Sequence, residues 1–99
     1  MGLQIEEHQE VELEAITPRL YKVILLNDDV TTFEFVIELL QDLFQKSFEE
    51  AVRLTFQIDR EGSGVVGIYP KEIAEAKVEA VHQRAQMAGF PLRAVMEEE

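Results

Sequence analysis

The sequence predicts an α+β fold, a β-α-α-β-α-β sandwich in which three helices pack on one face of a small, mainly antiparallel, three-stranded sheet. Three observations lead to this class. Short β-branched and aromatic segments bounded by turn residues predict strands, longer segments with apolar residues at helical spacing predict helices, and the two kinds alternate in that order. With 99 residues, 46% of them hydrophobic, the chain is long enough for one domain with one core.

The first strand and the first helix are joined by an acidic turn. Residues 20–26 are apolar and partly β-branched, and they stop at the turn-forming residues 27–29, so we expect a strand. Thr31 and Glu34 fit a capping box for the helix that follows. Its apolar residues cover an arc of about 200°, which predicts contacts with more than one neighbour. These residues are Phe33, Phe35, Val36, Ile37, Leu39, Leu40, Leu43 and Phe44.

A second capping box, Ser47 with Glu50, opens a shorter helix that we expect to end near Asp59. Residues 61–64 are turn formers, and residues 65–69 are typical of a strand. This helix and strand complete the first four elements.

The third helix is predicted from Pro70, at its first position, to Gly89, which would terminate it. Residues 92–96 can form a last strand. Lys77 falls inside the buried arc of this helix, where the simplest explanation is an aliphatic stem lying along apolar surface. The arc is defined by Ile73, Ala74, Val81, Ala85 and Ala88.

The charge is large and uneven. Twenty acidic residues against nine basic ones give −11, which disfavours binding to nucleic acid or to anionic membranes. We expect a flexible acidic N-terminal arm over residues 1–18, a core domain over 19–96 and an acidic tail over 97–99. The chain has no Cys and no visible signal segment, and its longest apolar run is too short to span a bilayer, so we expect a cytoplasmic protein.

Several apparent motifs fail in their context. Residues 62–67 match the glycine pattern of dinucleotide sites, but they lead into a strand instead of a helix. Residues 27–38 have calcium-loop spacing with Thr32 where that loop needs Gly. Asp28 and Asp29 are adjacent, so their side chains diverge, and no third ligand is suggested. We expect no metal, no cofactor and no catalytic site; on periodicity alone this turn carries solvated acids.

Residues 20–96 resemble the ClpS family. The resemblance is carried by the run from Tyr21 to Val36, which includes Asn-Asp-Asp before the Glu-Phe-Val start of the helix, by the run from Gly67 to Val78, and by Pro91-Leu92. It implies a non-enzymatic adaptor that recognises proteins by a bulky first residue, such as Phe, Tyr, Trp or Leu. Such an adaptor delivers them to the N-terminal domain of a AAA+ unfoldase, ClpA or ClpC, for degradation by ClpP. We expect the chain to act as a monomer.

The resemblance also implies a site for a free α-ammonium beside an apolar pocket. By resemblance, Asn27 and Asp28 bind the ammonium, while Asp29 and Thr31 shape the loop. Without the family, the pocket positions would be interpreted as ordinary core. The implied pocket wall is Phe33, Val36, Thr55, Ile58 and Leu92.

Three positions depart from the family pattern. Asp59 stands where better-known members have a His that contacts the substrate's amino group, and a carboxylate also accepts from an ammonium. Phe33 stands where the family commonly has Met, and Thr55 replaces a larger apolar residue. The preferred first residue therefore stays open.

Two further expectations concern delivery. By resemblance, Glu72 and Lys77 lie on the face that docks the unfoldase. Residues 1–18 are either a solubilising extension or, as in the family, a segment that enters the unfoldase. The main alternative to an adaptor function is a factor-recruiting interaction domain like that of the ribosomal stalk protein, which shares the fold class and has no link to proteolysis.

Overall fold

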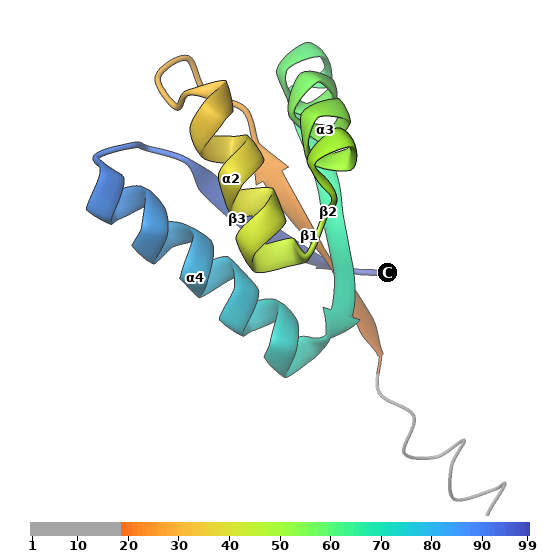
Figure 1. The fold of residues 1–99 in the computed structure, drawn as a ribbon. Coiled ribbons are helices and arrows are strands. Elements are labelled where there is room, and N and C mark those ends of the chain that lie inside the picture. The colour runs from red at the N-terminus through yellow and green to blue at the C-terminus, as the bar shows by residue number, and fades with distance from the viewer. Residues whose placement is uncertain (1–18) are drawn as a thin grey trace, which may run out of the picture.

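The computed structural model describes residues 19–99, and the expected N-terminal arm lies outside the described residues. The six elements follow the expected order, and the predicted fold class is confirmed (Figure 1). They are β1 (Leu20–Leu26), α2 (Phe33–Phe44), α3 (Phe48–Glu61), β2 (Ser63–Pro70), α4 (Lys71–Ala88) and β3 (Arg93–Glu98).

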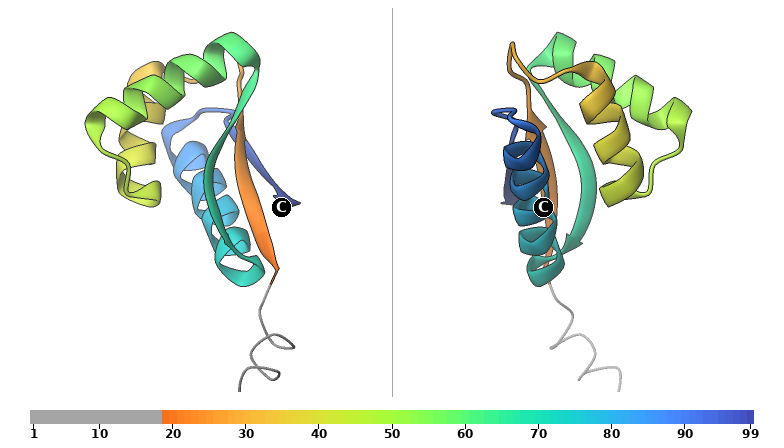
Figure 2. Two further views of the ribbon diagram at one scale, coloured as in Figure 1. Left: turned by 90° about the vertical axis from the view of Figure 1, so that its right-hand side faces the viewer. Right: turned by 60° about the vertical axis from the view of Figure 1, so that its left-hand side comes forward.

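The sheet has the strand order β2-β1-β3, with β1 antiparallel to both neighbours. Figure 2 shows the three helices on the same side of this sheet. Between Val23 and Ile24 the register with β2 shifts, because Val23 pairs with Gly67 while Ile24 pairs with Val65. The extra residue on β2 forms a β-bulge, which increases the local twist of the strand.

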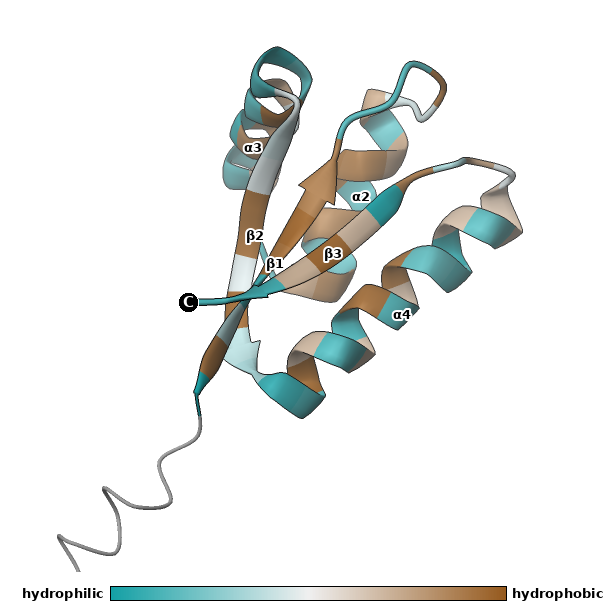
Figure 3. Ribbon diagram, turned by 180° about the vertical axis from the view of Figure 1, so that it is seen from behind, coloured by the Kyte–Doolittle hydropathy of each residue, from teal (hydrophilic) through white to brown (hydrophobic). Residues whose placement is uncertain are grey.

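The last strand is longer than the sequence predicts, and Figure 3 shows it from the uncovered side of the sheet. Glu97 pairs with Lys22, and the Glu98 carboxylate accepts from Arg19 at 3.1 Å. The positive charges of Lys22 and Arg19 thus stabilise the pairing of Glu97 and Glu98 with β1. Two of the three residues expected as an acidic tail therefore lie within β3.

The N-terminal caps of α2 and α3 follow local signals, with one correction. Ser47 caps α3 as predicted, since its hydroxyl accepts from the Glu50 N–H at 3.1 Å. Thr32, and not Thr31, caps α2 by accepting from the Phe35 N–H at 3.2 Å. The prediction of Thr31 was wrong because that hydroxyl is already bonded within the preceding loop.

Other helix ends lie within two residues of their expected positions. α3 runs to Glu61 and is closed by Gly62 in the left-handed region, φ 92°, which glycine adopts at little cost. α4 is terminated by Gly89 as expected, but it begins at Lys71, because Pro70 occupies the capping position instead of the first helical one.

The core lies between the sheet and the helix layer. α2 contacts α3, α4 and β2, which confirms the prediction of several neighbours from its wide apolar arc. α4 lies at the edge of the layer and buries a narrower stripe than expected, Ala74, Val81 and Ala85. Ile73 is 47% exposed and Ala88 is exposed, so their assignment to the buried arc was wrong. No helix within residues 19–99 is long and apolar enough to cross a membrane.

Candidate functional site

An apolar pocket lies at the C-terminal end of β1, between the loop that follows it, α2 and α3. It holds about 310 Å³ of empty space, part of it open to solvent. All its lining residues except Leu25 and Leu26 are among those that the sequence nominated. The lining residues are Leu25, Leu26, Asn27, Asp28, Thr31, Phe33, Val36, Thr55, Ile58 and Leu92.

The mouth of the pocket is a loop that Asp28 holds in shape. Its Oδ1 accepts from the backbone N–H groups of Val30, at 2.8 Å, and Thr31, at 2.7 Å. Its Oδ2 accepts from the Thr31 hydroxyl at 2.7 Å. An aspartate that bonds the backbone two and three residues on is a common loop-forming arrangement. Asp28, which we expected mainly to bind an ammonium, thus also shapes the loop together with Thr31.

These bonds determine the protonation of Asp28. Burial raises the pKa of its carboxyl, but the hydrogen bonds from Thr31 and Val30 outweigh burial and hold the pKa below the ordinary value of about 3.8. The carboxylate is therefore ionised at neutral pH, and Asp28 is among the residues that line the pocket.

Two further acceptors lie at the same loop. The Asn27 backbone N–H donates to the Gly62 carbonyl at 2.9 Å, which ties the loop to the start of β2. The Asn27 side chain and the exposed Asp29 carboxylate have no hydrogen-bond partner within residues 19–99. Asp29 and Asp59 do not line the pocket; Asp59 is an exposed residue of α3, next to Ile58.

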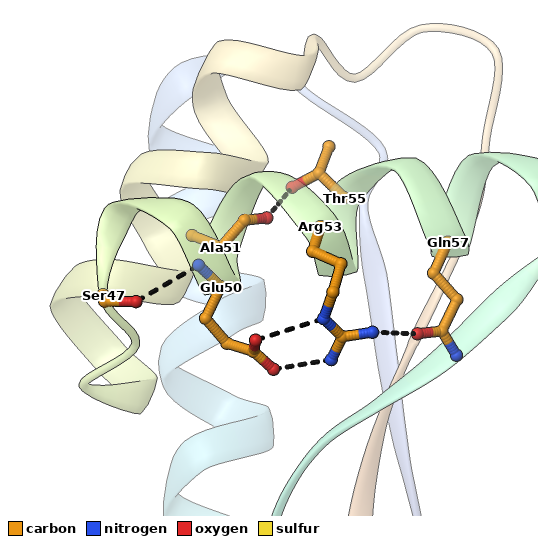
Figure 4. A network of polar contacts seen from close by, with 6 residues as sticks. All are labelled: Ser47, Glu50, Ala51, Arg53, Thr55 and Gln57. Carbon is orange, nitrogen blue, oxygen red and sulfur yellow. Dashed lines mark hydrogen bonds and ion pairs between the residues drawn. The ribbon is translucent and has the colours of Figure 1, made fainter.

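The α3 wall of the pocket is apolar despite its threonine. The Thr55 side chain is buried, and its hydroxyl donates to the Ala51 carbonyl one turn earlier at 2.7 Å (Figure 4). The hydroxyl proton is therefore already donated to a backbone carbonyl of the same helix, so Thr55 provides no hydrogen-bond donor to the pocket. On the exposed side, Arg53 bonds the Glu50 carboxylate at 2.6 Å and Gln57 at 3.4 Å, which stabilises the helix.

Close packing behind Ile58 completes this wall. A Cβ added to Gly64 would lie 2.8 Å from Ile58 Cγ1, closer than such atoms approach. Gly64 therefore allows β2 to pass directly against the side chain that forms the floor of the pocket.

Sequence reasoning missed an aromatic neighbour of the pocket. The Phe33 and Phe56 rings pack in a T-shaped arrangement, with centroids 5.1 Å apart and planes at 87°. Phe56 is 52% exposed and falls outside the apolar arc of α3, so the helical periodicity did not indicate that it lies near the pocket. Leu25 and Leu26 were also missed, although the end of a strand at a polar turn is a signal that could have found them.

The two nominated docking residues lie away from the pocket, on α4. Glu72 is exposed in the first turn of the helix. Lys77 is half-buried; its Nζ donates to the Leu43 carbonyl at 2.6 Å and lies 5.8 Å from the Phe44 ring centroid and 5.6 Å from that of Tyr69. Lys77 therefore links α4 to the C-terminal end of α2, where a positive charge is favourable. Residues 19–99 contain no cluster of three or more side chains suited to a metal ion.

Comparisons with known proteins agree with this architecture. Residues 16–95 match the family described as ATP-dependent Clp protease adaptor protein ClpS. An adapter protein ClpS of Nautilia profundicola is 60% identical over 89 residues, which are 90% of this chain and 92% of the relative. That of Wolinella succinogenes is 46% identical over 97 residues, 98% of this chain and 95% of the relative.

A solved structure is similar as well. Agrobacterium tumefaciens ClpS2 bound to L-phenylalaninamide is 41% identical and superposes with a TM-score of 0.80, covering 83% of this chain and 99% of that one. The matched residues 16–95 include β1, α2, α3, β2, α4 and the first half of β3, and the matches cover most of each relative's length. The chain belongs to the ClpS family of ATP-dependent Clp protease adaptor proteins.

Proposed function

We propose that this chain binds proteins by a free, bulky N-terminal residue and delivers them to a ClpA-type or ClpC-type AAA+ unfoldase for degradation by ClpP, without catalysing a reaction itself. The observation that carries the proposal is the apolar pocket with acceptors at its mouth. The ligand of the Agrobacterium relative, phenylalaninamide, combines a free α-amino group with a benzyl side chain, which is the chemistry this pocket fits.

In this proposal the two halves of the substrate's first residue meet different parts of the site. The α-ammonium lies against the oxygens of Asn27, Asp28 and Asp29, at the loop braced by Thr31. The side chain enters the apolar pocket. Its wall is formed by Phe33, Val36, Thr55, Ile58 and Leu92.

The free energy of binding requires both the side chain and the ammonium of the substrate's first residue. Micromolar affinity corresponds to about 8 kcal/mol, while burial of a Phe-sized side chain supplies about 2–3 kcal/mol. A charge-assisted hydrogen bond adds about 1.5–3 kcal/mol, before the costs of ordering both partners. Neither contribution suffices alone, so the site selects for a free terminus and a bulky side chain together.

Asp59 is proposed as a supplementary acceptor. It follows Ile58 on α3 and is exposed, so a contact to the ammonium would run along the rim of the pocket, directly or through water. An Asp59→His variant, measured with the same peptides, tests this role. If Asp59 contributes charge, affinity falls and becomes more sensitive to pH near neutrality, because histidine titrates there; equal affinities would remove Asp59 from the site.

Recognition is tested with peptides that differ only in their first residue. We expect Phe, Tyr, Trp and Leu to bind in fluorescence anisotropy, and Ala, Gly and Glu to bind at least about tenfold more weakly, because they leave the apolar pocket unfilled. Binding that does not depend on the first residue would contradict the proposal. It would favour an interaction domain of another kind.

Delivery is tested in a reconstituted degradation reaction with unfoldase, ClpP and a Phe-initiated reporter. Lys77→Glu should slow degradation while peptide affinity stays unchanged, and Glu72→Lys should act likewise, whereas Lys71→Glu is the control for a charge change at the start of α4. Because Lys77 also bonds Leu43, the folded state of that variant is checked by circular dichroism. Degradation at the original rate would remove these residues from the docking face.

The N-terminal arm belongs to the same proposal. Deleting residues 1–18 should leave peptide binding intact and slow delivery if the arm enters the unfoldase. Unchanged delivery would make the arm a solubilising extension only.

A further inference from the structure

A second hollow borders the apolar pocket at the start of β3. It holds about 320 Å³ of empty space, part of it open to solvent, and we call it the Arg93 hollow. Leu26, Asn27 and Asp28 line both cavities, so the two share a wall only one chain segment thick. The Arg93 hollow is lined by Leu26, Asn27, Asp28, Pro91 and Arg93.

The β1–β3 pairing places Arg93 beside this wall. Arg93 is opposite Leu26, the last residue of β1, and directly follows Leu92 of the apolar pocket. Figure 3 shows the end of β1 and the start of β3 side by side. Arg93 therefore lies at the start of β3, beside the end of β1, and these two strand ends also contribute residues to the apolar pocket.

Arg93 is an available positive charge. It is the only cation among the residues that line the two cavities. The structure describes five arginines, and the other four form ion pairs, while Arg93 is exposed and has no ion pair within residues 19–99. A free guanidinium offers a fork of donors that fits a carboxylate. The paired arginines are Arg19, Arg53, Arg60 and Arg84.

Backbone geometry directs the second residue of a bound peptide toward this hollow. An extended chain advances about 3.3–3.6 Å per residue, and successive side chains point to opposite sides. When the first side chain fills the apolar pocket and the ammonium lies at Asn27, the second side chain points away from the pocket, across the shared wall. Arg93 lines the hollow that shares this wall.

We propose that the Arg93 hollow is a second subsite that takes the carboxylate of an Asp or Glu following the bulky first residue. This inference rests on the proposed function and names a preferred substrate class for it. The peptide's ammonium would contact Asp28, and the carboxylate that follows it would contact Arg93. Each charge on the peptide would then lie next to an opposite charge on the site. Because the chain carries a net charge of −11, its overall field disfavours a carboxylate on the peptide, and Arg93 offsets this field locally.

The test compares Phe-Asp with Phe-Asn peptides, identical elsewhere and free at the N-terminus. Wild type should bind Phe-Asp about 2–5-fold more tightly, the range for an exposed ion pair. Arg93→Gln should abolish or reverse this preference without weakening the Phe-Asn peptide. Lys71→Gln is the matched control: it removes the same charge beside the Leu20–Pro70 end of β1, about 20 Å away, and should keep the preference.

The outcomes separate the subsite from the proposed function. Tight binding of both peptides, with a ratio that Arg93→Gln leaves unchanged, overturns the subsite alone. Failure of every free Phe-initiated peptide to bind overturns the proposed function and the subsite with it. Arg93→Glu supplies an independent check, since it should shift preference to a Phe-Lys peptide; an unshifted preference also overturns the subsite.

Discussion

At the scale of single residues, Asp28 braces the loop and is also a proposed acceptor for the substrate's ammonium. Three donors on Val30 and Thr31 hold its carboxylate, whereas the neighbouring Asp29 is exposed. The pair therefore offers a matched comparison. Asp28→Asn changes loop and charge together, while Asp29→Asn changes charge alone.

The pKa of Asp28 predicts how stability depends on pH. Its pKa is lowered in the folded state, so its contribution is fully present above the ordinary value of about 3.8 and is lost as pH falls through the lower folded value. Asp28→Asn should lower the free energy of unfolding by about 1–2 kcal/mol at pH 7 in urea titrations, and the difference from wild type should shrink below about pH 4. Asp29→Asn should leave stability unchanged. A difference that grows on acidification would contradict the assignment.

Thr55 sets how much room the α3 wall leaves in the pocket. Thr55→Val keeps the shape and removes a hydroxyl that bonds only Ala51, so affinity for a Phe-initiated peptide should stay within about threefold of wild type. Thr55→Met adds volume and should weaken Trp-initiated peptides more than Leu-initiated ones, by about tenfold in anisotropy titrations. Equal losses for both peptides would mean that Thr55 does not limit pocket size.

At the scale of elements, β2 supports α3 from behind through a glycine. A Cβ at Gly64 would meet Ile58 Cγ1 at 2.8 Å, so Gly64→Ala should cost about 1–3 kcal/mol of stability and push Ile58 into the pocket. Peptide affinity should fall with it.

A double-mutant cycle isolates this contact. In an Ile58→Ala background the added methyl has room, so Gly64→Ala should cost clearly less in urea titrations. The same cost in both backgrounds would show that the effect is local to β2 and does not pass through the pocket floor.

The elements are also where prediction from sequence succeeded best. Their order, the Ser47 cap and the Gly89 end all follow from signals within a few residues of each other. The Thr31 cap failed for a reason that the sequence pattern does not show. Two neighbouring threonines compete for one role, and a bond to Asp28 decides between them.

The candidate site was predictable only in part. The loop and wall residues were nominated by resemblance, and the structure brings Asn27, Asp28 and Thr31 to the same pocket as the five wall residues. The exposed positions of Asp59 and Phe56 and the place of Arg93 depend on how α3 and β3 cross the end of β1. Such placements arise from tertiary packing, which leaves no periodic signal in any one segment.

At the scale of the whole molecule, the proposed functions lie at different ends of α2. Phe33 opens this helix at the pocket, while Leu43, near its other end, receives Lys77 of α4. Ten residues of helix separate them by about 15 Å. The proposed substrate site and the proposed unfoldase-docking face are therefore separate, which would let both partners bind at the same time.

The proposed site binds a free α-ammonium and a bulky side chain together. The most direct measurement is the affinity of one Phe-initiated peptide, free or N-acetylated, by fluorescence anisotropy. Acetylation removes the positive charge and leaves the side chain unchanged, so affinity should fall at least about a hundredfold, the value of one to two charge-assisted hydrogen bonds. Equal affinities for the two peptides would contradict it.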